Sequence, residues 1–217
     1  MNYLVKTIFH LLSVFFHPLL VIMYTLFLYV LINPYLFPYH GERDFGTIVL
    51  IVFFTSVLIP GISILLMYGT GFISSLHMKE RTERIGPLIV TAIAYLWLYL
   101  NIRTHNAIPI SFALFVLGAL ISIFFAFFIN NFSKISLHGV GMGGFLSGVI
   151  YLLFKHGESY VSIKGVMMNN ILFLSLLIIL TGAVLSSRLY LKAHTNQDVI
   201  GGLIVGMAGQ IIALRFF

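Results

Sequence analysis

The chain has 217 residues, a length that is most simply one domain. Hydrophobic residues make up 60% of it and charged residues only 8%, against about 25% charged in soluble proteins, so the composition excludes an ordinary soluble domain and indicates a polytopic helical membrane protein. The net charge of +6 comes from basic residues in separate short loops, which argues against nucleic acid as a partner and favours membrane lipids or an anionic substrate.

Seven apolar runs separated by polar loops predict the membrane-spanning helices, because a span needs roughly 20 residues. The first run is longer than the apolar core of a signal peptide and lacks a small-residue cleavage site, so we interpret it as a retained span. Pro18 interrupts this run and removes a helical hydrogen bond, which predicts a kink. The predicted spans are residues 4–32, 46–67, 87–100, 108–129, 139–154, 166–185 and 199–217.

Three polar segments lie between these spans, at residues 68–86, 130–138 and 187–198. Two predicted spans separate the first segment from the second, and two more separate the second from the third. An even number of crossings returns the chain to the same membrane face, so we expect all three segments to open on one side of the bilayer. Ionisable groups at the ends of membrane spans are costly to place and therefore indicate a functional site.

The third segment contains Ser187-Arg188, five residues, His194, three residues and Asp198. A neutral imidazole attacks through one ring nitrogen when the other holds the proton, and a carboxylate that accepts this N–H fixes the tautomer. An arginine nearby can bind a phosphoryl group through two parallel hydrogen bonds. The alternative is structural: residues 195–198 resemble a capping box with Asp198 at its third helical position, and Arg188 is then an interface anchor.

Ser136 and His138 precede a glycine-rich helix start. Free backbone N–H groups at a helix N-terminus bind anions, and a histidine there can protonate a leaving oxygen. The glycines have the small-xxx-small spacing that brings membrane helices close, so we expect them mainly to pack. The spaced pairs are Gly139/Gly143, Gly144/Gly148 and Gly202/Gly206.

The remaining histidines lack the spacing of metal ligands, so we predict no zinc site and no other metal. The chain contains no cysteine, which excludes disulfides and thiolate chemistry. The histidines without a predicted role are His10, His17, His40, His77, His105 and His156.

Taken together, the three polar segments resemble the type 2 phosphatidic acid phosphatase family, which shares its core with the vanadium haloperoxidases. The pattern of that family is Lys, six residues, Arg-Pro; then Pro-Ser-Gly-His; then Ser-Arg, five residues, His, three residues, Asp. The third element is complete here, from Ser187 to Asp198. The resemblance covers about residues 79–206, and the order and same-side placement of the three elements agree with it.

The first two elements match the family pattern in part. Ser136 and His138 match the second element, and Lys79 and Pro87 keep the spacing of the first. The departures are Ile135 in place of Pro, Leu137 in place of Gly and Gly86 in place of Arg.

The resemblance implies a role for each matching residue. His194 would attack phosphorus and form a phosphohistidine, Asp198 would orient it, and His138 would protonate the leaving group and then activate water. No metal or other cofactor is implied. The residues implied to hold the phosphoryl oxygens are Lys79, Arg188 and Ser136. Arg84 lies two residues from Gly86, and we hypothesise that it takes the place of the missing arginine.

We therefore expect an all-α bundle of about six to seven spans in one membrane domain, residues 1–217. Residues 1–67 would form N-terminal spans, and residues 68–217 would hold a phosphatase-like core. The expected substrate is a lipid phosphomonoester or pyrophosphate, and the expected location is a bacterial cytoplasmic membrane, with the side of the site left open.

Two other functions are considered. A degenerate family member would bind or move phospholipids without hydrolysis; Gly86 favours this alternative, and the presence of both His138 and His194 argues against it. A transporter is disfavoured because the ionisable residues lie at span ends, whereas transport sites lie near the bilayer midplane.

Overall fold

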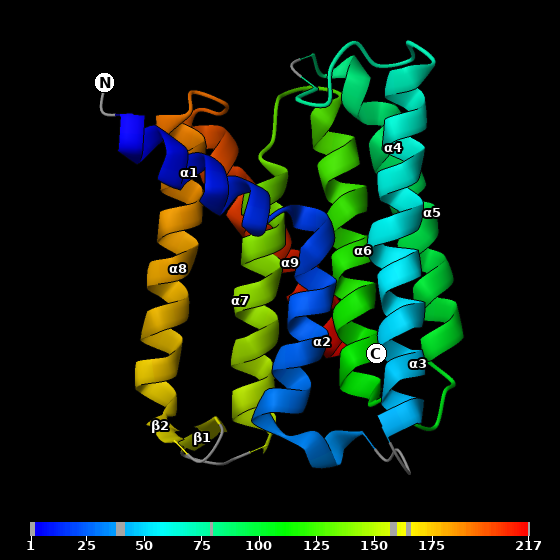
Figure 1. Ribbon diagram of the computed structural model, residues 1–217, viewed down its shortest axis with the longest axis vertical. Coiled ribbons are helices and arrows are strands. Elements are labelled where there is room, and N and C mark those ends of the chain that lie inside the picture. The colour runs from blue at the N-terminus through cyan, green and yellow to red at the C-terminus, as the bar shows by residue number, and fades with distance from the viewer. Residues whose placement is uncertain (1–2, 38–41, 79, 157–159, 164–165, 217) are drawn as a thin grey trace.

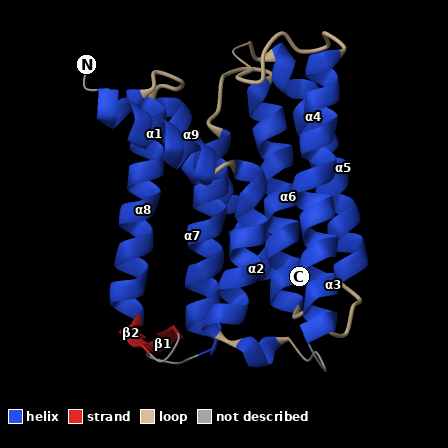
Figure 2. Ribbon diagram, in the orientation of Figure 1, coloured by secondary structure: helices blue, strands red, loops and turns tan. Residues whose placement is uncertain are grey.

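The computed structural model describes residues 3–37, 42–78, 80–156, 160–163 and 166–216. These residues form an upright bundle of helices with one short pair of strands at its lower end (Figure 2), so the predicted all-α membrane fold is confirmed. The elements are α1 (Tyr3–Phe15), α2 (Val21–Ile32), α3 (Glu42–Phe53), α4 (Ile59–Gly69), α5 (Ile85–Ile102), α6 (Ile110–Asn130), α7 (Leu137–His156), β1 (Tyr160–Ile163), β2 (Val166–Asn169), α8 (Asn170–Tyr190) and α9 (Asn196–Phe216).

Six helical segments among the described residues are long and apolar enough to span a membrane. One of them, Phe45–Gly69, joins α3 to α4 through a π-helical turn, η3 (Phe54–Leu58). Another, Thr82–Ile102, begins with the 3₁₀ turn η4 (Thr82–Arg84) and is longer than the predicted span of residues 87–100. The predicted span began at Pro87, because a proline interrupts most helices. However, a proline is tolerated in the first turn of a helix, where its missing N–H costs nothing.

The first predicted span is bent, as Pro18 indicates. The 3₁₀ turn η1 (Pro18–Leu20) separates α1 from α2, whose segments meet at 44°, and together they form a bent pair that brings the possible spans to seven. Figure 1 shows α2 running along the bundle while α1 crosses obliquely over its upper end. The helix α1 packs on α8, where the rings of Phe9 and Tyr190 lie 4.7 Å apart.

The strands β1 and β2 pair as an antiparallel hairpin at the lower end of the bundle (Figure 1). The prediction that the sixth span begins at residue 166 is therefore wrong. Asn169 sets the true start, because its side-chain oxygen accepts a hydrogen bond from the N–H of Ile171 at 2.7 Å and caps α8. The predicted span took in these four strand residues because Val166, Met167 and Met168 are apolar in either structure.

Glycines bring α7 and α9 into backbone contact. A Cβ on Gly139 would lie 2.7 Å from the carbonyl oxygen of Val199, and one on Gly206 would lie 2.7 Å from the N–H nitrogen of Gly144. Both distances are below van der Waals contact, so the expectation that the glycines pack is confirmed. Because Gly139 and Val199 follow His138 and Asp198, this packing also fixes the positions of those two residues relative to each other.

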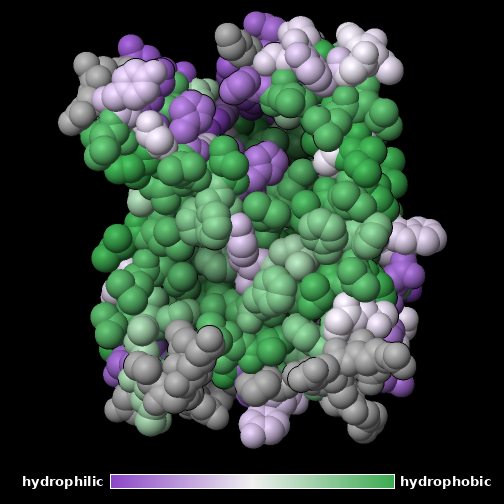
Figure 3. All heavy atoms as spheres, viewed as in Figure 1, coloured by the Kyte–Doolittle hydropathy of each residue, from purple (hydrophilic) through white to green (hydrophobic). Residues whose placement is uncertain are grey.

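The loops that hold the three predicted polar segments lie at one end of the bundle. In Figure 1 the loop after α4, the loop before α7 and the loop before α9 all lie at the top, whereas the 3₁₀ turn η2 (Pro34–Leu36), the turn after α5 and the strands β1 and β2 lie at the bottom. The predicted placement on one side is therefore confirmed. A broad hydrophobic band separates the two ends (Figure 3), as expected for a surface in contact with lipid.

Candidate functional site

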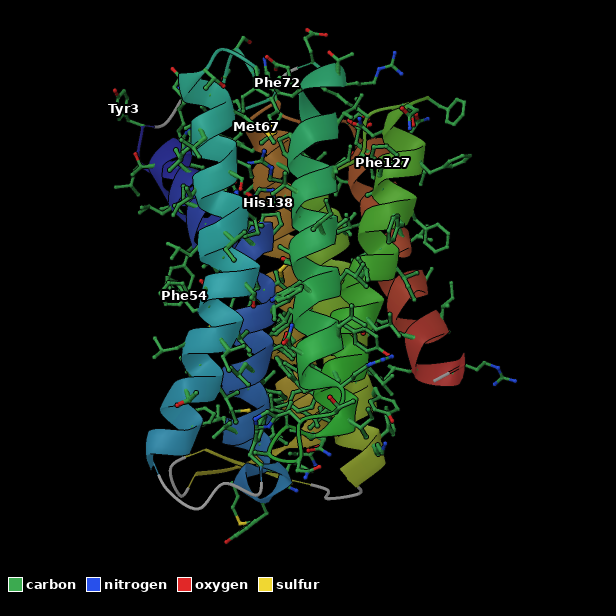
Figure 4. The ribbon with its side chains drawn as sticks, turned by 90° about the vertical axis from the view of Figure 1, so that its right-hand side faces the viewer. Tyr3, Phe54, Met67, Phe72, Phe127 and His138 are labelled. Atoms are coloured by element: carbon green, nitrogen blue, oxygen red, sulfur yellow. The ribbon has the colours of Figure 1, made fainter. Side chains whose placement is uncertain are left out.

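A cavity of about 400 Å³ lies beneath the three polar loops. It brings together Arg84 from η4, His138 from the first turn of α7, Arg188 from the last turn of α8 and His194 from the loop before α9. Figure 4 places His138 within the bundle, below its upper end. The sequence predicted all four of these residues as site residues, and they come from separate helices and loops.

His194 and Asp198 meet as the spacing predicts. The Nδ1 atom of His194 lies 3.4 Å from the Oδ2 atom of Asp198, and the histidine side chain is only 5% exposed. A carboxylate only accepts, so Nδ1 carries the proton and Nε2 keeps the free electron pair. The length of this contact makes it a weak hydrogen bond.

The capping-box alternative for Asp198 is also present. Its Oδ2 atom accepts a hydrogen bond from the N–H of Thr195 at 2.9 Å, and the Thr195 hydroxyl lies 3.3 Å from the N–H of Asp198. The two interpretations are compatible, because one carboxylate oxygen serves both the helix start and His194. The cap therefore holds the carboxylate in the position where it orients the imidazole.

The environment of His194 favours its neutral form. Burial, followed by the positive charges of Arg84 and Arg188, lowers the pKa of His194 from 6.5 to about 4, although the hydrogen bond and the charge of Asp198 act in the opposite direction. At neutral pH the imidazole is therefore uncharged, with an unprotonated Nε2. This is the state that a nucleophilic histidine needs.

We expect NMR of histidine-labelled protein to show that His194 titrates near pH 4, with His194→Ala used to assign its signal. In Arg84→Ala the pKa should rise, because a positive charge that disfavours the imidazolium is removed. The folded state binds this proton less well than the unfolded chain, so the stability contribution of His194 is full above pH 6.5 and is lost as the pH falls toward 4. A titration centred at 6.5 would contradict the geometry described above.

Arg84 is buried at the edge of the cavity. It is 7% exposed, its Nη1 donates to the carbonyl of Ile135 at 2.9 Å, and its Nε donates to the carbonyl of Met78 at 3.1 Å. These bonds connect η4 to the loop before α7. They occupy two of the five N–H donors of the guanidinium, and its Nη2 has no hydrogen bond to any described residue.

A side chain at position 86 would be directed toward Phe72 and Met67. A Cβ on Gly86 would lie 2.9 Å from the ring of Phe72 and 3.0 Å from the sulfur of Met67. Figure 4 shows that Phe72 and Met67 lie nearer the top of the bundle than His138 does. A side chain at position 86 would therefore be directed at the ends of these two side chains and would displace them, while Arg84 already lies at the cavity.

The helix α1 contributes groups that lie outside the three predicted polar segments. The Nε2 atom of His138 lies 2.9 Å from the carbonyl oxygen of Ser13. A carbonyl only accepts, so Nε2 carries a proton and Nδ1 is the atom available for proton transfer. The hydroxyl of Ser13 accepts a hydrogen bond from Nη1 of Arg188. Ser13 therefore contacts two of the predicted site residues, His138 and Arg188.

Two further histidines of this region, His10 and His17, also line the cavity, as does His77 from the loop after α4. No role was predicted for these histidines. A signal was available, because His10, Ser13 and His17 are spaced by three and four residues in an otherwise apolar run. This spacing places polar groups on one face of a helix and indicates a surface directed at a polar interior.

One of the predicted phosphate ligands, Ser136, is not placed at the cavity. Ser136 is fully buried but does not line it; the Ser136 hydroxyl accepts a hydrogen bond from the N–H of Gly139 at 3.3 Å, and its own N–H donates to the carbonyl of Asp198 at 3.0 Å. Its contacts are those of a helix cap that joins α7 to α9. Lys79 lies outside the described residues.

In the part of the chain that the structure describes, no group of three or more His, Cys, Asp or Glu side chains is arranged to hold a metal ion. Comparison of the chain with protein-family models, curated proteins and solved structures gave no match.

Proposed function

We propose that this integral membrane protein is a phosphatase that hydrolyses a lipid phosphomonoester or pyrophosphate through a phosphohistidine, as a divergent member of the type 2 phosphatidic acid phosphatase family. One observation carries the proposal. Two arginines, the buried Arg84 and the partly buried Arg188, share a cavity with the neutral, carboxylate-oriented His194 and with His138. Positive charge beside an uncharged nucleophile suits a phosphoryl group better than it suits a neutral substrate.

In the first step the electron pair on Nε2 of His194 forms a bond to phosphorus, and the bond from phosphorus to the leaving oxygen breaks. His138 gives its Nδ1 proton to that oxygen. A bound phosphate favours the protonated state of His138, because an opposite charge nearby stabilises the imidazolium. Asp198 stabilises the positive charge that develops on His194.

In the second step the neutral His138 takes a proton from water through Nδ1. The water oxygen forms a bond to phosphorus, the N–P bond breaks, and its electron pair returns to Nε2 of His194. The net reaction consumes one water and releases inorganic phosphate, together with an alcohol from a phosphomonoester or a lipid monophosphate from a pyrophosphate. Arg84 and Arg188 stabilise the charge on the transferring oxygens in both steps, mainly by position and electrostatics.

The location of the cavity supports a lipid substrate. It lies at the polar end of the bundle, and most of its remaining lining is apolar, including Val21, Leu88 and Phe115. Figure 3 shows a recess in the upper half of one face, where hydrophilic side chains lie beside hydrophobic ones. A phosphate group can occupy the polar part while its hydrocarbon chain remains in an apolar environment.

The test is phosphate release by the detergent-purified protein from a panel of lipid phosphates with EDTA present. We expect release from at least one lipid, and a rapid acid-free quench should trap a phosphoryl group that is stable to alkali and labile to acid, as an N–P bond is. Release that EDTA abolishes would contradict the metal-free mechanism. Binding of lipid phosphates by folded protein without any release would favour the non-hydrolysing lipid binder.

A further inference from the structure

Three histidines that the proposed reaction does not use also line the cavity. His10 and His17 come from the N-terminal part of the chain, and His77 comes from the loop after α4. The ring of His17 lies against the ring of His138, with the two ring centroids 5.9 Å apart and the ring planes at 80°. His17 is therefore a direct neighbour of the histidine that is proposed to protonate the leaving group.

The backbone fixes the position of His17. The residue lies at the bend between α1 and α2, and Pro18 after it favours the extended conformation that His17 has, with φ −61° and ψ 137°. Its Nδ1 atom accepts a hydrogen bond from the N–H of Leu19 at 3.4 Å, which caps η1. A Cβ on Gly141 would lie 3.6 Å from the Cα atom of Pro18, so the bend packs on α7 within one turn of His138 (Figure 1).

The other ring nitrogen of His17 is free to bind a ligand. A neutral imidazole carries one proton, and because Nδ1 accepts a hydrogen bond, the proton is on Nε2. This Nε2–H makes no hydrogen bond to any residue that the structure describes. The side chain of His17 is exposed and lines the cavity, so an atom of a ligand can reach it. The cavity thus has an accessible N–H donor beside His138.

The side of the cavity that holds His138 is the side of the leaving group. In the proposed reaction His194 attacks phosphorus, and the leaving oxygen departs in line with the attack, toward His138. A donor beside His138 therefore faces the part of the substrate that is attached to this oxygen. In a lipid phosphomonoester that part begins with a methylene group, which accepts no hydrogen bond. In a lipid pyrophosphate it is a second phosphate group, whose charged oxygens are strong acceptors.

Positive charge and space are present for a second phosphate. The hydroxyl of Ser13 accepts a hydrogen bond from Nη1 of Arg188, and the carbonyl oxygen of Ser13 lies 2.9 Å from Nε2 of His138. Arg188 and His138 are therefore held beside the same residue of α1. The cavity volume of about 400 Å³ lies within the range of small-molecule sites.

We propose that His17 determines substrate specificity by donating from Nε2 to a non-bridging oxygen of a second phosphate, and that the substrate is a lipid pyrophosphate. The terminal phosphate is transferred to His194. The bond from its phosphorus to the bridging oxygen breaks, and that oxygen leaves on the lipid monophosphate with the proton from His138. This inference rests on the proposed function and selects between its two substrate classes.

The experiment measures binding in His194→Ala, in which the proposed nucleophile is absent. The probes are a monoalkyl pyrophosphate and a monoalkyl phosphate of the same chain length, and the readout is the dissociation constant from thermal stabilisation of the detergent-purified protein. His17→Asn, added to this background, keeps an oxygen that can accept from the N–H of Leu19 but is too short to replace Nε2. It should weaken pyrophosphate binding by about tenfold, as expected for one hydrogen bond to a charged group, and leave monophosphate binding unchanged.

Two further variants separate ligand binding from the capping role. His17→Gln has an amide nitrogen that can take the position of Nε2, so it should keep most of the affinity for pyrophosphate. The matched control is His105→Asn, at the opposite end of the bundle, where Nδ1 of His105 accepts from the N–H of Ala107 at 3.2 Å in the same local arrangement. It should change neither dissociation constant.

An equal loss of affinity for both probes in His17→Asn, or no loss for either, would overturn the inference. Turnover by protein with an intact His194 separates it from the proposed function. If this protein releases phosphate and His17→Asn changes kcat/KM equally for both probes, the pyrophosphate assignment is wrong and the phosphatase stands. If His17→Asn weakens only pyrophosphate binding but neither probe is hydrolysed, the phosphatase is wrong and the pyrophosphate site stands.

Discussion

The variant His194→Ala should lose phosphate release by about 10⁴-fold or more, because a covalent mechanism has no path without its nucleophile. The trapped phosphoryl group should disappear at the same time. Loss of one small loop side chain leaves the α7–α9 backbone contacts in place, so the melting temperature should change little. The measurement is single-turnover phosphate release together with labelling of the protein.

The matched control is His105→Ala, which removes an exposed histidine from the loop after α5, at the opposite end of the bundle. It should keep wild-type activity. A further arm adds imidazole to His194→Ala, since the freed volume can admit a small nucleophile. Phosphate release that persists in His194→Ala without imidazole would show that water or another residue attacks phosphorus.

The second large effect is expected at Arg84. The variant Arg84→Ala should lower kcat/KM by about 10²- to 10³-fold, the usual cost of removing one donor that stabilises transition-state charge. Arg84→Lys should recover only part of this loss, because an ammonium lacks the planar pair of donors. Arg81→Ala, three residues earlier and exposed, provides the control and should have a small effect.

Because Arg84 also bonds to the carbonyls of Ile135 and Met78, its replacement costs stability as well. Melting temperatures and activities at a lower temperature separate the two contributions. Adding Gly86→Arg to Arg84→Ala should not restore activity, since a side chain at position 86 meets Phe72 and Met67. Restoration would show that the family position, and not Arg84, is aligned with the substrate.

The residues that the sequence located correctly are those whose placement depends on local spacing or on the parity of crossings. His194 and Asp198 are four residues apart at a helix start, so their contact follows from one turn of backbone. Arg84, His138 and Arg188 follow from the alternation of spans, which returns their three segments to one end. The bend between α1 and α2 could be predicted from Pro18 because the effect of a proline on a helix is also local.

The features that could not be predicted from the sequence depend on how the helices pack in space. Ser13 reaches His138 and Arg188 only because α1 crosses the upper end of the bundle, and no short-range pattern specifies that path. Ser136 matched a motif, yet its hydroxyl caps a helix, because residue type alone does not give the direction of a side chain. Gln210 lies in an apolar run where nothing nearby in sequence indicates a cavity.

The contact between Ser13 and Arg188 spans 175 positions of the chain and has a consequence for biosynthesis. During translation α1 leaves the ribosome long before α8, the helix on which it packs. Its outer face carries exposed apolar side chains such as Leu4, Leu11 and Phe15. Such a face can bind at the membrane interface until α8 has been made. Contacts so distant in sequence form late. In the newly made protein, Ser13 and Arg188 therefore come into contact only after nearly all of the helices have been inserted into the membrane.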